Sequence, residues 1–304
     1  MPSIFASITD LINSPPAYLV AGGALATLVW KIFERIENVL TEGTKQEIAS
    51  WLRVRSIDAA LVAESLTNWP NTFTKIFDRV FGTRHLSWKC LLRSLAASST
   101  VTVLLVMLTP LLSRHHEPVP NVAAPMKHDL LVTLMLLALT NLIPDYIALL
   151  ETRVVLGYMR RKVSATWWFG LMLIDIVLTV YTAEIGATIV AGVAFNVFTG
   201  SPFQLSEFVS KLGHVLRSPL TQLRFVSRTG QWFLIYPAFL TSIWLWLYAA
   251  AGLLLRAVRQ LDISFEWFNR RFDIERKPLQ SIGLVAGGLV AFGYWAGVIV
   301  NHWI

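Results

Sequence analysis

The sequence predicts an all-α protein, a polytopic transmembrane helix bundle of five or six spans with a small helical cytosolic module. Composition is the first observation that favours this fold class. Hydrophobic residues make up 55% of the 304 positions and charged residues only 15%, whereas soluble domains carry about 25% charged residues. The second observation is that the apolar residues gather in runs of about 20, the length that a helix needs to cross the hydrocarbon core. An integral membrane protein is therefore expected.

The five clearest spans follow from uncharged runs. Ser94–Ser113 has twenty uncharged residues between two arginines, and Gly230–Leu255 is uncharged over 26 residues. The stretch Leu130–Lys162 begins as an apolar run and ends in a basic turn, and Ser281–Ile304 closes the chain with another apolar run. The fifth run, from Ala165 to Phe198, is too long for one untilted span. It therefore tilts, projects beyond the membrane or turns back within it.

Whether the N-terminus adds a sixth span is left open. Ala17–Trp30 is apolar, but its fourteen residues cover only about 21 Å of a hydrocarbon core near 30 Å. This segment crosses the bilayer only if neighbouring residues join the same helix. Residues 1–30 are therefore interpreted as membrane-associated, with or without a complete crossing.

Short helices are predicted for residues 31–93, the cytosolic module. Gly43, Pro70 and Gly82 are expected to end helices, and Gly82 to do so in a left-handed conformation. Thr44 and Glu47 have the spacing of a capping box for the second helix. Ser87 is expected to cap the helix that runs on into the bilayer.

Lysine and arginine predict the orientation, because the cytosolic loops of membrane proteins are enriched in both. With residues 31–94 inside, the inside segments hold 20 of the 26 basic residues. Residues 94–304 then form the transmembrane bundle, with a cytosolic amphipathic segment at 256–280 and the C-terminus outside. The basic loop 201–231 would be better placed inside, which a hairpin at Glu184 would allow.

Two acidic residues within the predicted spans need an explanation, because a carboxylate at the bilayer centre costs roughly 2.5–3.5 kcal/mol on insertion scales. Counted along the helices, Asp175 lies about 15 Å from the inner interface and Asp145 about 9 Å, which makes Asp175 the deeper acid. Asn141 shares a helix face with Asp145, and Pro144 is expected to kink that helix. These polar residues either line a path for ions or protons, or hold neighbouring helices together in neutral form.

Two GxxxG spacings occur on the last span, and such spacings allow helices to approach each other closely. Gly283 and Gly287 form the first pair, and Gly293 and Gly297 form the second. The partner helix is either another span of the same chain or a neighbouring subunit. We favour a contact within a homo-oligomer.

Two clusters of basic residues lie at the predicted cytosolic ends of spans, where they would attract anions. Contact with the anionic lipid of the bilayer is the common explanation for such residues. A nucleotide or nucleic-acid ligand is the alternative, although no Gly-rich phosphate loop or stacking motif accompanies them. The residues are Arg79, Arg84, Lys89, Arg93, Arg153, Arg160, Arg161 and Lys162.

The sequence contains no recognisable catalytic motif. It has no GxSxG, HExxH or Walker-type spacing, and the single Cys90 excludes an internal disulfide. His115, His116 and Glu117 lack the spacing of a helical metal site. We therefore expect no enzymatic activity, no cofactor and no metal.

Two stretches resemble segments of bacterial multi-pass inner-membrane proteins: FDRVFGTRHLSWKCLLRS at Phe77–Ser94 and PDYIALLETR at Pro144–Arg153. The resemblance covers the first half of the chain. It implies a bacterial inner-membrane location, without an activity and without functional residues. Some membrane proteins of this size act as effectors in phage-defence operons, where an oligomer opens the inner membrane on a cytosolic signal. This last point is an analogy of context.

The leading hypothesis from the sequence is an oligomeric inner-membrane pore or ion channel. It would be gated by a cytosolic signal such as an anionic ligand, and its lining would include Asp175, Asp145 and Asn141. The alternative is a non-conducting membrane anchor or adaptor whose cytosolic helices bind a protein partner. An intramembrane enzyme acting on lipid is a third interpretation, for which a paired base and nucleophile are missing.

Overall fold

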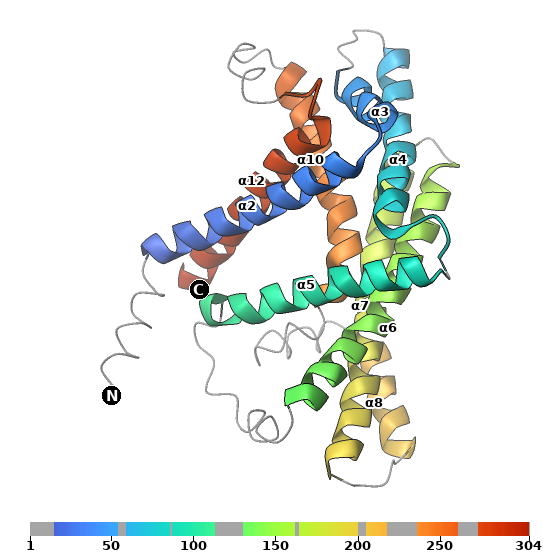
Figure 1. Ribbon diagram of the computed structural model, residues 1–304, viewed down its shortest axis with the longest axis vertical. Helices are drawn as coiled ribbons and strands as arrows, with labels where there is room; N and C mark the ends of the chain where they lie inside the picture. Colours follow the sequence, from blue (N-terminus) through green and yellow to red (C-terminus); the bar gives the residue numbers. More distant parts are fainter. Residues whose placement is uncertain are drawn as a thin grey trace. The chain divides into compact units, whose positions relative to one another are not determined.

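A computed structural model describes residues 15–53, 59–85, 87–112, 130–161, 164–199, 205–217, 236–260 and 273–303. Over these described residues the structure is all-helical, 91% helical without strands, and Figure 1 shows the elements in chain order. They are α2 (Pro15–Val39), α3 (Glu42–Arg53), α4 (Ala59–Phe81), α5 (Trp88–Leu112), α6 (Leu130–Met159), α7 (Ala165–Thr199), α8 (Leu205–Arg217), the short 3₁₀ helix η3 (Tyr236–Phe239), α10 (Leu240–Gln260) and α12 (Pro278–Trp303). The chain divides into two compact units, Met1–Val80 with Arg160–Ser164 and Trp244–Ile304, and Phe81–Met159 with Ala165–Ile243.

Three helices are long and apolar enough to cross a membrane, within the part of the chain that the structure describes. They contain the stretches Thr166–Gly186 of α7, Leu240–Ala257 of α10 and Pro278–Val300 of α12. The predicted fold class is therefore confirmed as all-helical with candidate membrane spans. Five or six spans and a separate cytosolic module remain predictions, and α2 is not among the three candidate spans.

The surface of α7 is arranged as expected for a helix in lipid. Large apolar side chains such as Phe169, Ile174 and Val177 are exposed, whereas Asp175 and Glu184 are buried. A helix in water shows the reverse pattern, with polar residues outside. Because α7 is one continuous helix of 35 residues, about 52 Å long, it does not turn back at Glu184, the alternative considered for placing loop 201–231 inside. The helix exceeds the length of the hydrocarbon core by about 20 Å.

Close backbone contact joins α2 to α12 in the first unit. The two helices lie side by side in Figure 1. A Cβ atom added at Gly287 would lie 2.5 Å from the carbonyl oxygen of Ala26, and one at Gly283 would lie 2.3 Å from Cβ of Phe33. The first GxxxG pair therefore packs within the chain, and the prediction of an oligomer contact fails for these two glycines.

The second pair has a different environment. A Cβ atom added at Gly293 or Gly297 would have no described neighbour within 4 Å, and nearby Phe292, Ile299 and Val300 are strongly exposed. This end of α12 therefore presents exposed apolar side chains beside two glycines that no described atom contacts. An oligomer contact remains a prediction for this pair alone.

A buried carboxyl group caps the start of α12. Oε2 of Glu37, near the end of α2, accepts hydrogen bonds from the backbone N–H groups of Leu279 (2.6 Å) and Gln280 (3.0 Å). The first N–H groups of a helix have no partner within it, and a carboxylate there also complements the helix dipole. Burial nevertheless raises the pKa of Glu37, since desolvation outweighs the two N–H donors.

An aromatic cluster joins α3 and α4 to the part of α10 in the first unit. Tyr248 is fully buried and stacks on Trp51, with ring centroids 5.4 Å apart, and Phe73 lies 4.9 Å from Tyr248 and 5.0 Å from Trp244. Gly252 allows this arrangement, because a Cβ atom there would lie 2.0 Å from the Trp51 ring. The α3–α4 segment thus packs on a helix that is itself a candidate span.

The helix boundaries confirm two predicted signals. Gly82 has a φ of 93° directly after the end of α4, and its lack of a side chain permits this left-handed conformation. The hydroxyl of Ser87 accepts a hydrogen bond from the N–H of Cys90 at 3.2 Å and caps α5.

Two other boundary predictions are wrong. Gly43 lies inside the first turn of α3, and the side chain of Thr41 accepts the hydrogen bond from the N–H of Thr44. Pro70 lies inside the continuous helix α4. Pro144 likewise lies within α6, so packing around these two prolines outweighs the backbone hydrogen bond that each removes.

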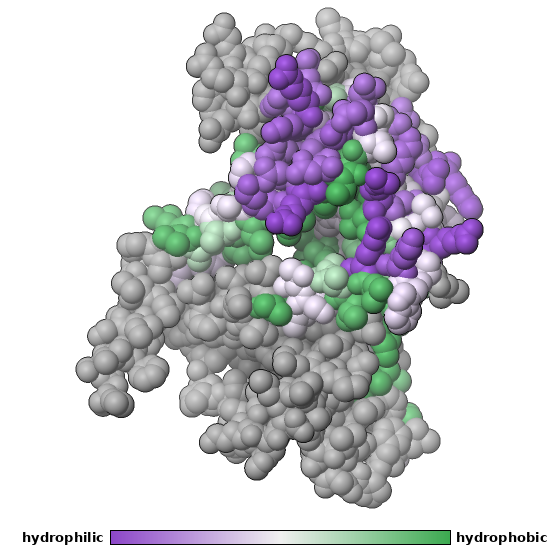
Figure 2. Space-filling view, viewed as in Figure 1, coloured by the Kyte–Doolittle hydropathy of each residue, from purple (hydrophilic) through white to green (hydrophobic). Residues whose placement is uncertain are grey.

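Hydrophilic and hydrophobic surfaces are separated on the first unit. Figure 2 shows hydrophilic side chains over α3, the C-terminal end of α2 and the beginning of α12, whereas hydrophobic side chains cover the N-terminal half of α2. Leu19 and Val20 in that half are 62% and 70% exposed. The N-terminal half of α2 is therefore suited to lipid, as predicted for a membrane-associated segment.

Glycine substitutions test the contact between α2 and α12. Gly287→Ala places a methyl group against the Ala26 carbonyl oxygen and is expected to lower the free energy of unfolding by about 1–3 kcal/mol. Gly293→Ala is the matched control on the same helix, where the added methyl group meets no described atom. Thermal unfolding of purified protein in detergent measures both, and equal stability of the two variants would contradict this packing.

The Glu37 cap is tested by truncation. Glu37→Ala leaves the N–H groups of Leu279 and Gln280 without their acceptor and is expected to lower the free energy of unfolding by about 1 kcal/mol. Glu42→Ala is the control, because its side chain is 79% exposed and pairs only with Lys45 three residues away. Denaturant titration of both variants decides the matter, and a Glu37 variant as stable as wild type would argue against the cap.

Candidate functional site

The second unit is built on an antiparallel hairpin of α6 and α7. Nε1 of Trp168 donates a hydrogen bond to the carbonyl oxygen of Met159 at 2.9 Å. This bond sets the register at the connected end of the hairpin, where α6 ends and α7 begins. Further along, a Cβ atom added at Gly186 would lie 2.1 Å from Cγ of Pro144. Glycine at this position lets the two helices approach each other where the proline ring protrudes.

Helix α5 and the 3₁₀ helix η3 pack on this hairpin. The face of α5 that is buried carries Ser94, Ser98 and Thr102, at the four-residue spacing that aligns side chains along a helix. At the start of α10, Thr241 and Ser242 are also buried. Hydroxyl groups from two elements therefore point toward the interior of the unit.

These hydroxyls meet the acidic residues of the hairpin and form what we call the polar seam. Ser98 donates a hydrogen bond to Oδ2 of Asp145. Thr182 donates one to Oε1 of Glu151, and hydroxyl pairs link Thr152 to Thr241 and Thr179 to Ser242. The members of the polar seam are Ser98, Asp145, Glu151, Thr152, Asp175, Thr179, Thr182, Thr241 and Ser242.

Asp175 is the most deeply buried acidic residue of the polar seam. Its side chain is fully buried and lies beside the hydroxyls of Thr152 and Ser242. Neither carboxyl oxygen has a hydrogen-bond partner among the residues that the structure describes. Glu151 lies close enough to interact electrostatically with it, so the two acids repel each other when both are ionised.

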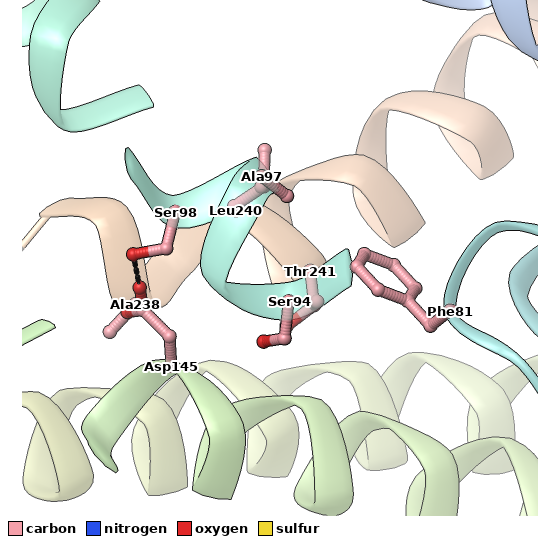
Figure 3. A pocket seen from close by; sticks show the side chains of 8 residues that line it. All are labelled: Phe81, Ser94, Ala97, Ser98, Asp145, Ala238, Leu240 and Thr241. Carbon is pink, nitrogen blue, oxygen red and sulfur yellow. Dashed lines mark hydrogen bonds between the residues drawn. The ribbon is translucent and has the colours of Figure 1, made fainter. Parts of the chain in front are cut away.

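Asp145 faces a small cavity. Figure 3 shows its carboxyl group directed from α6 toward Ser98 on α5, with the hydroxyls of Ser94 and Thr241 nearby. The cavity contains about 10 Å³ of free volume, close to the roughly 10–15 Å³ that one water molecule requires. Oδ1 of Asp145 has no hydrogen-bond partner among the described residues.

Along the hairpin, the two aspartates lie in the reverse of the order that was counted from the presumed span boundaries. Asp175 lies beside Thr152, which is seven residues or about 10 Å from Met159. Asp145 is fourteen residues or about 21 Å from Met159. Asp145 is therefore the acid further from the connected end of the hairpin. Counting from each presumed span boundary placed the two helices in the wrong register.

Arg153 has a structural contact that the sequence did not reveal. Its guanidinium group donates hydrogen bonds to the carbonyl oxygens of Gly82 and Thr83, the latter at 2.8 Å. These carbonyls follow the end of α4, where backbone acceptors lack partners within the helix. The two stretches that carried the family resemblance, Phe77–Ser94 and Pro144–Arg153, thus meet at this loop.

A histidine is enclosed at the same loop. The ring of His85 stacks on Tyr146 with centroids 4.5 Å apart, and the hydroxyl of Tyr146 donates to the carbonyl oxygen of His85. Burial lowers the pKa of His85 below its ordinary value of 6.5, and the positive charge of Arg153 lowers it further.

Other predicted basic ligands also contact the protein itself. Nε of Arg79 donates to the carbonyl oxygen of Val39 at 2.9 Å, and Nε of Arg160 donates to Oδ1 of Asn71 at 2.8 Å. Arg84, Lys89, Arg93 and Arg161 are exposed, and Lys162 lies outside the described residues. Arg79, Arg153 and Arg160 thus have hydrogen-bond partners within the protein, and an anion site at the basic residues stays a prediction.

Several predictions fall on residues that the structure does not describe. Asn141 belongs to α6, but its side chain lies outside the described part, as do His115, His116, Glu117 and the amphipathic segment Leu261–Phe272. Among the described residues there is no group of three His, Cys, Asp or Glu side chains arranged to hold a metal.

Sequence reasoning missed the hydroxyl partners of the acids. These partners include Ser98, which donates to Asp145, and Thr152 and Ser242, which lie beside Asp175. One signal was available, because Ser94, Ser98 and Thr102 repeat every four residues in an otherwise apolar span and this spacing marks one helix face. Their pairing with α6 depends on tertiary packing.

Comparison with known proteins finds no matching family model, no matching curated protein and no matching solved structure. The function of the polar seam is therefore argued from its geometry.

The partly buried His85 predicts a dependence of stability on pH. The pKa of His85 is lower in the folded protein than in the unfolded chain, so its contribution is complete above pH 6.5 and is lost as pH falls through the folded pKa. His85→Gln is expected to reduce the loss of stability on acidification between about pH 8 and 5. Thermal unfolding in detergent across this range measures the effect.

His214→Gln on α8 is the control, because that side chain is exposed. If the His85 and His214 variants lose stability on acidification as steeply as wild type does, His85 is not the group responsible.

Proposed function

We propose that the protein is an inner-membrane pore or ion channel that works as an oligomer and conducts protons or small cations along the polar seam. The observation that carries the proposal is the position of three acids between apolar helices: Asp145 and Asp175 are buried and Glu151 is half-buried. Among the described residues, hydroxyls hydrogen-bond to Asp145 and Glu151 and lie beside Asp175, and no basic residue hydrogen-bonds to any of the three. Acidic groups inside a membrane domain are costly and typically belong to ion or proton pathways.

The dimensions of the seam support this function. Asp145 and Thr152, the residue beside Asp175, are seven residues apart on α6, so the acids extend over about 10 Å along the hairpin. This distance is a third of a hydrocarbon core of about 30 Å. Acceptors and hydroxyls spaced over such a length replace part of the hydration shell of a cation or relay a proton.

The outer surface is compatible with a membrane position for the seam. On α7 the side chains opposite Asp175 are apolar and exposed, among them Leu173 and Val177. The polar side chains thus face the protein and the apolar ones face outward, which is the arrangement a bilayer requires. The open glycines Gly293 and Gly297 are the surface that we propose for subunit contact.

Gating by a cytosolic signal and a part in phage defence belong to the same proposal. The exposed basic residues Arg84, Lys89 and Arg93 are the side chains that we assign to an anionic ligand such as a nucleotide or nucleic acid. Arg153 is not assigned to it, because its guanidinium group already binds two backbone carbonyls.

Flux through proteoliposomes tests the conducting function. Asp175→Asn keeps the shape of the side chain and removes its charge and acidic proton, and we expect it to lower proton or cation flux about tenfold or more, since a barrier higher by about 1.4 kcal/mol is sufficient. Asp273→Asn is the matched control, because Asp273 is exposed and an amide oxygen can still accept the hydrogen bond from the N–H of Arg276.

Absence of flux in wild-type protein under all ionic conditions, together with an unchanged cellular effect of Asp175→Asn, would reject the channel. The alternative of a non-conducting anchor or adaptor for a protein partner would then be preferred.

A further inference from the structure

We infer that the cavity beside Asp145 is a binding site for one sodium ion, with Asp145 as the charged ligand and serine and threonine oxygens around it. The inference rests on the proposed function for the idea that ions enter this unit, and it deepens that function by naming the ion. Sodium binding at this site can be measured separately from conduction.

The cavity has the size of one small occupant. Residues of α4, α5, α6, η3 and α10 line a partly open cavity with about 10 Å³ of free volume, which suits one water-sized ligand. Figure 3 shows Asp145 and Ser98 at one end of the site, Phe81 at the other, and Ser94 and Thr241 between them. A hydrated divalent ion, which keeps several water molecules, exceeds this space.

The charge of Asp145 calls for a positive ligand. The residue is only 6% exposed, and Ser98 occupies Oδ2 while Oδ1 has no hydrogen-bond partner in the described part of the chain. No described charged group acts on this carboxyl. Water would hydrogen-bond to Oδ1 but leave an ionised carboxylate uncompensated, whereas a bound cation, like a proton, removes that cost.

The chemistry of the lining also suits a hard cation. Carboxylate and hydroxyl oxygens are the donors that such ions prefer, and the lining side chains contain no nitrogen or sulfur donor. Ala238 and Leu240 bring the junction between η3 and α10 to the cavity wall.

Sodium-dependent stability tests the site. Purified protein in detergent is unfolded thermally while sodium chloride replaces choline chloride at constant ionic strength, and potassium chloride is the comparison salt. Sodium is expected to raise the midpoint temperature with the logarithm of its concentration, and potassium to have a clearly smaller effect because the cavity is small. Asp145→Asn is expected to lose the sodium response.

Two further variants keep the inference testable if Asp145→Asn does not fold. Ser94→Ala and Thr241→Val each remove one oxygen of the lining while leaving the charge of Asp145, and each is expected to raise the half-maximal sodium concentration severalfold. Asp273→Asn is the control, because Asp273 is exposed and does not line the cavity, so the sodium response should persist. Equilibrium binding of radioactive sodium to the same samples gives an independent measurement.

Three results would overturn the sodium site: equal stabilisation by sodium, potassium and choline, a sodium response that survives in Asp145→Asn, or stabilisation that follows pH alone, which indicates a proton or water in the cavity. Sodium binding without any flux would support the site and reject the channel. Flux without specific sodium binding would support the channel and reject the site.

Discussion

Burial of carboxyl groups inside an apolar helix hairpin is the constraint on which the second unit depends. A carboxylate in such surroundings is unfavourable by several kcal/mol unless polar groups surround it. The unit supplies these groups from helices that are distant in sequence: Ser98 from α5, Thr182 from α7, and Ser242 from α10, which lies beside Asp175. The packing of α5 and of the start of α10 against the hairpin thus brings hydroxyl groups to the carboxyl groups inside it.

The first unit depends on the contact between α2 and α12. Helices in lipid gain little from burying apolar side chains, so they associate through close packing and a few hydrogen bonds. Gly283 and Gly287 bring α12 against α2 at backbone distance, and Glu37 supplies acceptors for the N–H groups at the start of α12. Small residues and one cap therefore take the place of a hydrophobic core between these two helices.

The contacts of the arginines narrow the functional interpretation. Arg153 satisfies carbonyls after α4, Arg79 binds the end of α2, and Arg160 binds Asn71. Guanidinium groups that complete helix ends and loops in this way contribute to folding before they contribute to ligand binding. A ligand for the basic surface is therefore better sought among the exposed residues of the α4–α5 loop and the start of α5.

The sequence by itself determined the helical fold class, the positions of most helices and which residues would be costly to bury, because composition and the length of apolar runs depend only on local chemistry. It also determined the turn at Gly82 and the cap at Ser87, which act within a few residues. The tertiary structure alone decided the register of α6 against α7, and with it the order of Asp145 and Asp175 along the hairpin. Counting residues along one helix does not show how the neighbouring helix is aligned with it. The tertiary structure also decided that Gly287 meets Ala26 while Gly293 stays open, because identical spacings differ only in what packs against them.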